Sequence, residues 1–335
     1  MSNLLIGLLS ALVATNEPVA AASQPPAKAP GIFVSSPART RNTNDPVELE
    51  LTRIMLEDEA AMKEADKWLK EAEAFAEKGA GASKATVALR VEQRLAPVRK
   101  AYEEFLEKHP DHVDGRVAYA SFLSDLEEED LATEQWEKAL KLDQKNPAIW
   151  NNLANAYGHR GPVKKAFEYY AKAIALNPKE PVYYQNFGTT VYLFRKDAME
   201  FYGIGEQQVF DKALELYAQA TKLDPKNFLL ATDVAQTYYG IRPPRHEEAL
   251  KAWNYALELA PTDLERQATW LHLARVKMNA GKFDEARKLL ADVTNPDMDD
   301  LKKRLARSLE YKEKKAKGEA AEEPAEARAE KAPGK

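Results

Sequence analysis

The chain has 335 residues, of which 44% are hydrophobic and 30% are charged, and its formal net charge is −5. This composition excludes disorder along the whole chain, and the acidic balance argues against sequence-independent binding of nucleic acid. The sequence contains no cysteine, so disulfides, thiolate metal sites and cysteine nucleophiles are excluded together.

The N-terminus combines a short apolar segment with small residues. Residues 4–13 carry no charge, Pro18 follows as a helix breaker, and small residues extend to Ala22. This pattern is similar to a signal peptide, although residues 1–3 lack Lys and Arg. We predict a signal peptide at 1–22 and an exported, periplasmic or cell-envelope protein. The alternative is an apolar helix that docks on the fold of a cytoplasmic protein. No apolar stretch is long enough to cross a bilayer as a helix, so no transmembrane segment is predicted.

Two helices are predicted before residue 112. Residues 23–44 contain four prolines and are predicted to form a flexible linker. Asp45 is a suitable cap for a helix that starts at Pro46 and continues to about Lys78, with an apolar stripe at helical spacing. A second helix is predicted over 84–108.

From residue 113 the sequence repeats at a regular interval. The clearest unit contains, in this order, Trp150, Leu153, Ala154, Tyr157, Gly161, Ala166, Tyr170, Ala173 and Pro178. This order and spacing resembles the tetratricopeptide repeat (TPR), in which each unit is a pair of antiparallel helices. Five units are predicted, at 113–146, 147–180, 181–227, 228–263 and 267–300, and a degenerate unit precedes them within the N-terminal helices of 45–112.

The resemblance implies an all-α, helix-turn-helix solenoid with a right-handed superhelix and a concave groove. It also implies a non-enzymatic module for protein–protein interaction, because one repeat cannot bury its own apolar faces and repeats stack into an extended surface. In this family the first helix of each unit lines the concave face. A protein or peptide partner is therefore expected.

Three columns of the predicted groove are rich in amides when the units are aligned by their repeat interval. Thr232, Asp233 and Gln236 fill these columns in the fourth unit. The predicted peptide-binding residues are Asn151, Asn152, Asn155, Gln185, Asn186, Thr189, Gln236 and Tyr239. Amides can donate to and accept from a peptide main chain, and the pattern is similar to the asparagine ladder of some TPR proteins. The alternative is that Asn and Gln occur in these columns only because they tolerate exposure to solvent, with no role in binding. A Lys/Arg clamp for chaperone tails is disfavoured in these columns.

The third unit is longer than its neighbours because it contains an insertion. The insertion, at 192–210, carries Tyr192, Phe194, Phe201 and Tyr202. We expect a first helix lengthened by about two turns, whose aromatic side chains form a possible partner surface. The alternative is local packing against the next unit.

The C-terminal residues change in composition. Residues 301–318 are basic with a modest apolar side and are predicted to form a capping helix, rather than a contact to an anionic membrane or nucleic acid. Residues 319–335 contain no large apolar side chain and are predicted to be disordered.

No catalytic constellation is found. His109, Asp111 and His112 offer nitrogen and oxygen ligands, but this segment is interpreted as a turn between units and no metal is predicted. There is no phosphate loop or nucleophile elbow, so neither a cofactor nor an enzymatic activity is expected. The alternatives are a self-assembling or multi-partner scaffold without peptide recognition, an enzyme with an unrecognised site and, least favoured by the acidic pI, an RNA-binding repeat.

Overall fold

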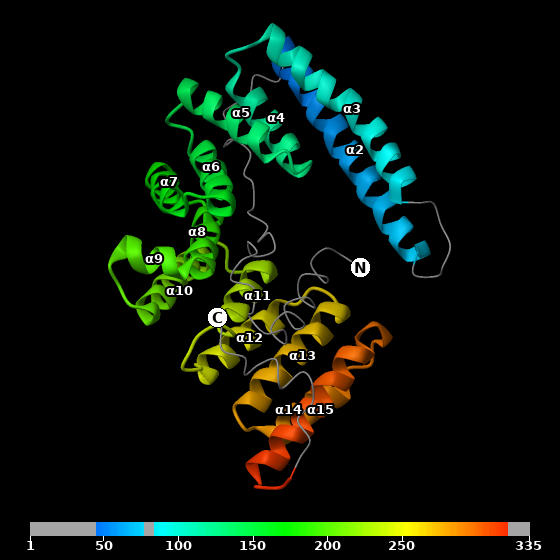
Figure 1. Cartoon of the computed structure of the whole chain (residues 1–335), viewed down its shortest axis with the longest axis vertical. Helices are drawn as coiled ribbons and strands as arrows, with labels where there is room; N and C mark the ends of the chain where they lie inside the picture. The colour runs from blue at the N-terminus through cyan, green and yellow to red at the C-terminus, as the bar shows by residue number, and fades with distance from the viewer. Residues whose placement is uncertain (1–44, 77–83, 321–335) are drawn as a thin grey trace. The chain divides into compact units, whose positions relative to one another are not determined.

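The computed structural model describes residues 45–76 and 84–320, and every regular element in these residues is helical (Figure 1). The predicted signal peptide, linker and C-terminal tail from 321 onwards lie outside the described residues. The helices are α2 (Pro46–Ala76), α3 (Lys84–Lys108), α4 (Val113–Asp125), α5 (Glu129–Leu142), α6 (Pro147–Arg160), α7 (Val163–Leu176), α8 (Pro181–Leu193), α9 (Arg195–Tyr202), α10 (Glu206–Leu223), α11 (Phe228–Thr237), α12 (His246–Leu259), α13 (Asp263–Asn279), α14 (Phe283–Asp292) and α15 (Asp299–Ala316), with a short 3-10 turn at Pro296–Met298. The described residues form two compact units, the N-terminal unit (45–178) and the C-terminal unit (179–320).

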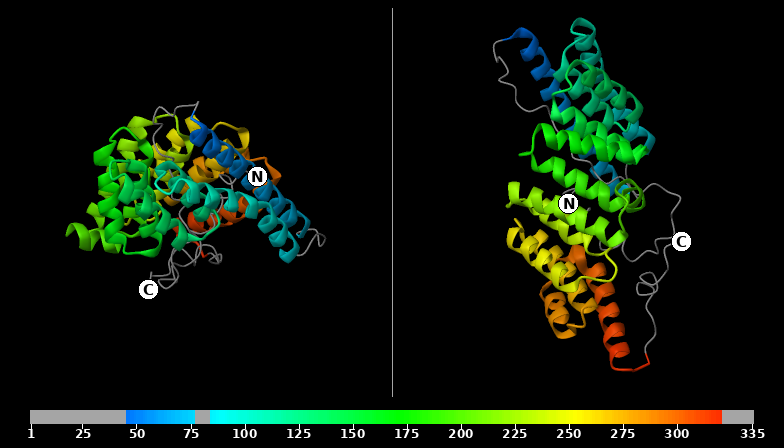
Figure 2. Two further views of the ribbon diagram at one scale, coloured as in Figure 1. Left: turned by 90° about the horizontal axis from the view of Figure 1, so that it is seen from above. Right: turned by 90° about the vertical axis from the view of Figure 1, so that its left-hand side faces the viewer.

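The N-terminal unit begins with a long helical hairpin. Helices α2 and α3, blue and cyan, lie side by side in the views of Figures 1 and 2. The carboxylate of Asp45 accepts a hydrogen bond from the Val47 backbone N–H at 2.9 Å, which satisfies a free donor of the first turn of α2. Leu51 and Phe105 are fully buried and Tyr102 nearly so. The hairpin is therefore held by an apolar seam of the kind that its sequence pattern predicts.

Two repeat hairpins follow, α4 with α5 and α6 with α7. Ala154 on α6 and Ala166 on α7 have no exposed surface, and their small side chains allow the two helices to approach closely. Each first helix has a polar cap. The His112 ring accepts from Gly115 N at the start of α4, and Asn146 accepts from Ala148 N at the start of α6. These features correspond to the first two predicted units.

The C-terminal unit contains the hairpins α8 with α10, α11 with α12, and α13 with α14. A Cβ atom on Gly188 of α8 would lie 3.2 Å from the Ala213 carbonyl oxygen of α10, which is a tight contact, so this close approach of the two helices favours glycine. Helix α15 packs on α13 and α14 and buries Leu301, Leu305 and Leu309. The last hairpin is thus covered on its open apolar side.

The insertion in the third unit differs from the expected lengthened helix. Helix α8 ends at Leu193, because Phe194 leaves helical geometry (φ −102°, ψ 45°). A separate short helix, α9, follows and packs on α10. It ends at Tyr202, and the next residue, Gly203, adopts a left-handed conformation (φ 64°) that favours glycine. The expectation of one continuous helix was therefore wrong.

A half-buried carboxylate in the N-terminal unit provides a test of the α2–α3 packing. The Tyr102 hydroxyl donates to Asp58 Oδ2 at 2.8 Å, and burial, with a smaller contribution from the charge of Asp125, raises the pKa of Asp58 to about 6. The folded state therefore retains a proton between about pH 4 and 6 that the unfolded state releases, and stability falls as the pH rises through this range.

We expect Asp58→Asn to raise the free energy of unfolding by about 1–2 kcal/mol at pH 7.5 and by about a third of that amount at pH 4.5, where most of the folded carboxyl is still protonated. The expected gain is set below the free energy equivalent of the full pKa shift because the carboxylate keeps partial contact with solvent. The asparagine still accepts from Tyr102. Urea unfolding followed by far-ultraviolet circular dichroism at both pH values measures the difference, and an equal effect at the two pH values would contradict the assignment.

Candidate functional site

The predicted groove residues lie on the first helices of the repeats or directly after them. In the N-terminal unit, α6 carries Asn151, Asn152 and Asn155. In the C-terminal unit, α8 carries Gln185, Asn186 and Thr189, α11 carries Gln236, and Tyr239 follows the end of α11. We call the set on α6 the N-terminal face and the set on α8, on α11 and directly after α11 the C-terminal face. Both are first-helix faces, and we describe them separately.

The three asparagines of the N-terminal face are buried. Their exposed fractions are 0% for Asn151 and Asn152 and 1% for Asn155. Asn151 Nδ2 donates to Asn152 Oδ1 at 3.2 Å, and the Tyr170 hydroxyl of α7 donates to Asn155 Oδ1 at 2.6 Å. At least part of this amide chemistry therefore joins α6 to α7 within one repeat.

The same internal pairing occurs in the third unit. Thr189 Oγ1 of α8 lies 2.8 Å from the Tyr217 hydroxyl of α10, at positions equivalent to Asn155 and Tyr170. Where tryptophan replaces this tyrosine, as at Trp136, the ring carries no hydroxyl, and Ser121 at the equivalent first-helix position donates to its own helix at Val117 O. The bonding of the third-column residue thus depends on whether the aromatic residue at the equivalent point of the second helix is tyrosine or tryptophan.

Polar side chains connect successive first helices across the C-terminal face. Gln185 Nε2 of α8 donates to Asp233 Oδ2 of α11 at 2.8 Å. Further along, the Tyr239 hydroxyl lies 2.8 Å from His272 Nδ1 of α13. Gln185 and Asn186 are each 5% exposed, whereas Gln236 is half-buried. Two polar contacts therefore connect consecutive repeats of this face, one from α8 to α11 and one from Tyr239 to α13, and we call their residues the polar array.

An aromatic and cationic cluster occupies the α13 end of this face. The Trp253 and His272 rings stack with centroids 4.0 Å apart and planes 11° from parallel. The Arg275 guanidinium lies 4.6 Å from the centroid of the Tyr239 ring, and burial raises the pKa of Tyr239 above its usual value although the Arg275 charge opposes the shift. Extending the three columns by one more unit would have found His272 and Arg275. The predicted groove residues end at Tyr239 and therefore do not include these two.

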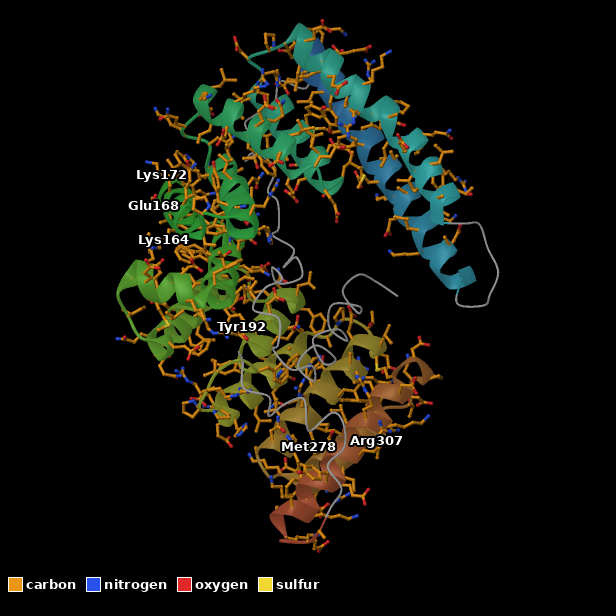
Figure 3. All side chains as sticks on the ribbon, viewed as in Figure 1. Lys164, Glu168, Lys172, Tyr192, Met278 and Arg307 are labelled. Atoms are coloured by element: carbon orange, nitrogen blue, oxygen red, sulfur yellow. The ribbon has the colours of Figure 1, made fainter. Side chains whose placement is uncertain are left out.

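The aromatic residues of the insertion occupy different environments. Tyr192, labelled in Figure 3, packs on Phe210 and against the backbone of Gly240, where any side chain on Gly240 would meet its hydroxyl. Tyr202 is half-buried and lies 4.4 Å beneath the Lys212 ammonium. Phe194 is half-buried at the break after α8, and Phe201 is 36% exposed. Phe201 is thus the most accessible of the four predicted contact residues.

The histidines near residue 110 do not converge with acidic side chains on a metal site. The His109 ring packs on Phe105, and His112 caps α4 through Nδ1 while its Nε2 lies 3.3 Å from Glu48 Oε1. Within 45–76 and 84–320, no group of three His, Asp or Glu side chains is placed to hold a metal ion. None of the helices in these ranges is long and apolar enough to cross a bilayer.

Comparison with known proteins gives matches to repeat families and to solved structures. Sequence models of the tetratricopeptide repeat match residues 125–161, 147–180 and 245–307. No curated protein matches the chain. Similar solved structures include PilW, a type IV pilus biogenesis factor (14% identity, TM-score 0.49, 70% of this chain and 91% of that chain). They also include Pseudomonas aeruginosa pilF (18% identity, TM-score 0.48, 77% and 99%) and YrrB, a TPR protein with an unusual peptide-binding site (17% identity, TM-score 0.42, 58% and 91%).

The repeat matches coincide with the helical hairpins of the structure. The match at 147–180 spans α6 and α7, and the match at 245–307 covers α12, α13, α14 and part of α15. Within these hairpins, the small residues of the repeat pattern are buried at the helix contacts, as at Ala154 and Ala166. The chain therefore contains tetratricopeptide repeats, matched at 125–180 and 245–307, and the residues that the structure describes form paired helices of the helix-turn-helix type.

Proposed function

We propose that this TPR protein is a non-enzymatic interaction module that binds an extended segment of a protein partner along its first-helix faces. The observation that supports this proposal most directly is the polar array of the C-terminal unit, from Gln185 and Asp233 to Tyr239 and His272. Side chains that connect consecutive repeats in this way present donors and acceptors along a line. An extended peptide has N–H and C=O groups along its length to pair with them.

The C-terminal face is the stronger part of this proposal. Gln236 is half-buried, and among the described residues its side chain makes no hydrogen bond, so its donor and its acceptor are both available to a ligand. Asn155 and Thr189 already bond to tyrosines of their own hairpins. In our proposal Gln236 is the principal contact to the ligand. Gln185 and Tyr239 contact it through the hydrogen-bonding capacity that their bonds to Asp233 and His272 leave unused. The N-terminal asparagines shape the face of the other unit.

Site-specific photocrosslinking tests the proposal. A benzophenone amino acid at Gln236 reports on the first-helix face, and the same group at Lys251, which is exposed on the second helix α12, is the matched control. We expect crosslinks from native cells to a distinct protein at position 236 and not at 251. Equal products at both positions would contradict binding at this face. Crosslinks at 236 only to another copy of the chain would favour a self-assembling scaffold.

We also propose that the protein is exported. The proposal rests on the apolar residues 4–13 and the small residues that end at Ala22. Sequencing the N-terminus of the protein purified from its native cells tests it. A start at Ala22 or Ser23 is the expected result, and a retained Met1 or Ser2 would contradict it.

A further inference from the structure

We propose that Asp233 selects a basic group, a lysine or arginine side chain, in the partner segment that binds the C-terminal face. This inference rests on the proposed function, because it assigns the chemistry of a ligand to the same face. The carboxylate lies where α8 and α11 meet. It adds recognition of a charge to the backbone contacts that the amides can make.

The geometry leaves one side of the Asp233 carboxylate without a bond. Oδ2 accepts from Gln185 Nε2 at 2.8 Å, and this is the sole hydrogen bond to the Asp233 side chain among residues 45–76 and 84–320. In the same ranges no Lys, Arg or His forms an ion pair with it, whereas Asp211 of the same unit pairs with Arg245. Asp233 is half-buried, so Oδ1 remains a strong acceptor with limited access to water.

The groups around Asp233 do not supply the missing charge. From α10 the Tyr217 hydroxyl approaches, but it pairs with Thr189 Oγ1 of α8. On α11 itself, Thr237 Oγ1 donates to the main-chain carbonyl of Asp233 rather than to the carboxylate. The charge of Asp233 helps to keep the pKa of Tyr217 high, which indicates that the two groups lie in one poorly hydrated region. These neighbours are neutral, so a cation must come from elsewhere.

Burial raises the pKa of Asp233 to about 6, and the hydrogen bond from Gln185 opposes the shift only in part. At neutral pH the side chain is therefore mostly ionised in a site that disfavours the charge. A ligand cation that meets Oδ1 offsets this cost and forms a charge-assisted hydrogen bond. A ligand carboxylate would be repelled. An apolar group would displace the remaining water without supplying a hydrogen bond to Oδ1 in its place. A basic side chain fits this position best.

Peptide binding to the full-length protein tests the inference. The probes are immobilised, acetylated and amidated nonapeptides with an Ala/Asn/Gly background, which differ only at the central residue: Lys, Arg, norleucine, Gln or Glu. Norleucine matches the apolar stem of lysine without its charge. The proteins compared are wild type, Asp233→Asn and Asp292→Asn. Asp292 is an exposed carboxylate at the end of α14 and serves as the matched control.

At pH 7.5 we expect wild type to retain the Lys and Arg peptides about tenfold better than norleucine, which corresponds to a single favourable charge contact. Asp233→Asn should reduce this preference to about twofold or less, while Asp292→Asn keeps it. The asparagine still accepts from Gln185, so this variant should fold. Its circular dichroism melting curve verifies that. At pH 5 protonation of Asp233 should reduce wild-type retention of the Lys peptide about tenfold.

The pH arm assigns the effect to one residue. An imidazole also changes its charge in this range, and His272 lies on the same face, so a pH step that persists in Asp233→Asn would assign the effect to another group and overturn the inference. A wild-type protein that prefers norleucine, or that retains no peptide, would also overturn it. In either case crosslinks from Gln236 to a distinct protein would leave the proposed function standing. Gain of peptide retention in Arg39→Ala/Arg41→Ala would identify the chain's own N-terminal residues as the occupant and overturn the assignment to a partner.

Discussion

Trp253→Ala is expected to lower the free energy of unfolding of the C-terminal unit by about 3–5 kcal/mol, the usual cost of truncating a large buried aromatic side chain. Trp253 has no exposed surface and belongs to the core formed by α11, α12 and α13. The truncation removes the ring that stacks on His272 and leaves a cavity between two consecutive repeats. Its effect should therefore extend beyond the hairpin that contains it.

Urea unfolding followed by far-ultraviolet circular dichroism measures this loss without relying on tryptophan fluorescence. Trp253→Phe keeps an aromatic ring at the same position and should cost about 1–2 kcal/mol. Asn254→Ala, at an exposed neighbouring position of α12, should change stability by less than about 0.5 kcal/mol. A loss below about 1 kcal/mol in Trp253→Ala, well under the usual cost of such a truncation, would show that this side chain does not hold the repeats together.

Gly115→Ala is expected to destabilise the N-terminal unit by about 1–3 kcal/mol, the range found for overpacked cores, and Gly115→Val by more. A Cβ atom on Gly115 would lie 2.6 Å from Phe105 Cε1 and 3.3 Å from His112 Nδ1. Phe105 has no exposed surface and cannot move aside without disturbing the α2–α3 seam. The added methyl group also presses on the imidazole that caps α4, since that ring accepts from Gly115 N.

Gly205→Ala is the matched control for this substitution. The backbone of Gly205 is extended (φ −78°), and the nearest atom to an added Cβ would lie 3.8 Å away. Thermal unfolding of the two variants should therefore differ clearly, with a melting temperature close to wild type for Gly205→Ala. A Gly115→Ala protein as stable as wild type would mean that α3 and α4 are farther apart than the structure places them.

The sequence predicted the hairpins well because the repeat pattern states where helices touch. Alanines such as Ala154 and Ala166 occur at a fixed spacing only where a larger side chain would hold two helices apart. The break at Phe194 was not predictable in this way. The insertion carries no proline or glycine before Gly203, so the end of α8 is decided by packing of α9 on α10 rather than by local propensity.

The repeat interval places Asn155 and Thr189 on the first helices of their units, as the structure does, but it does not indicate which atoms they bond. Their hydrogen-bond partners, Tyr170 and Tyr217, lie at equivalent points of the second helices. The alternation of tyrosine and tryptophan at this second-helix position is the sequence signal that would have indicated the hydrogen bond to the first helix. The hydrogen bond from Gln185 to Asp233 joins two consecutive repeats, so it depends on how the repeats pack on each other. The residue spacing within one repeat does not determine that packing.

Helix α15 restricts how this protein can assemble with itself. A stack of repeats ends in an apolar face that can accept the first repeat of another copy, and such head-to-tail contacts do not close and grow into filaments. Here that face of α13 and α14 is covered by Leu301, Leu305 and Leu309, while Lys303 and Glu310 point to solvent. Growth from this end would have to displace a helix and bury its charges. Self-association through the C-terminal end of the repeats is therefore disfavoured as long as α15 stays in place.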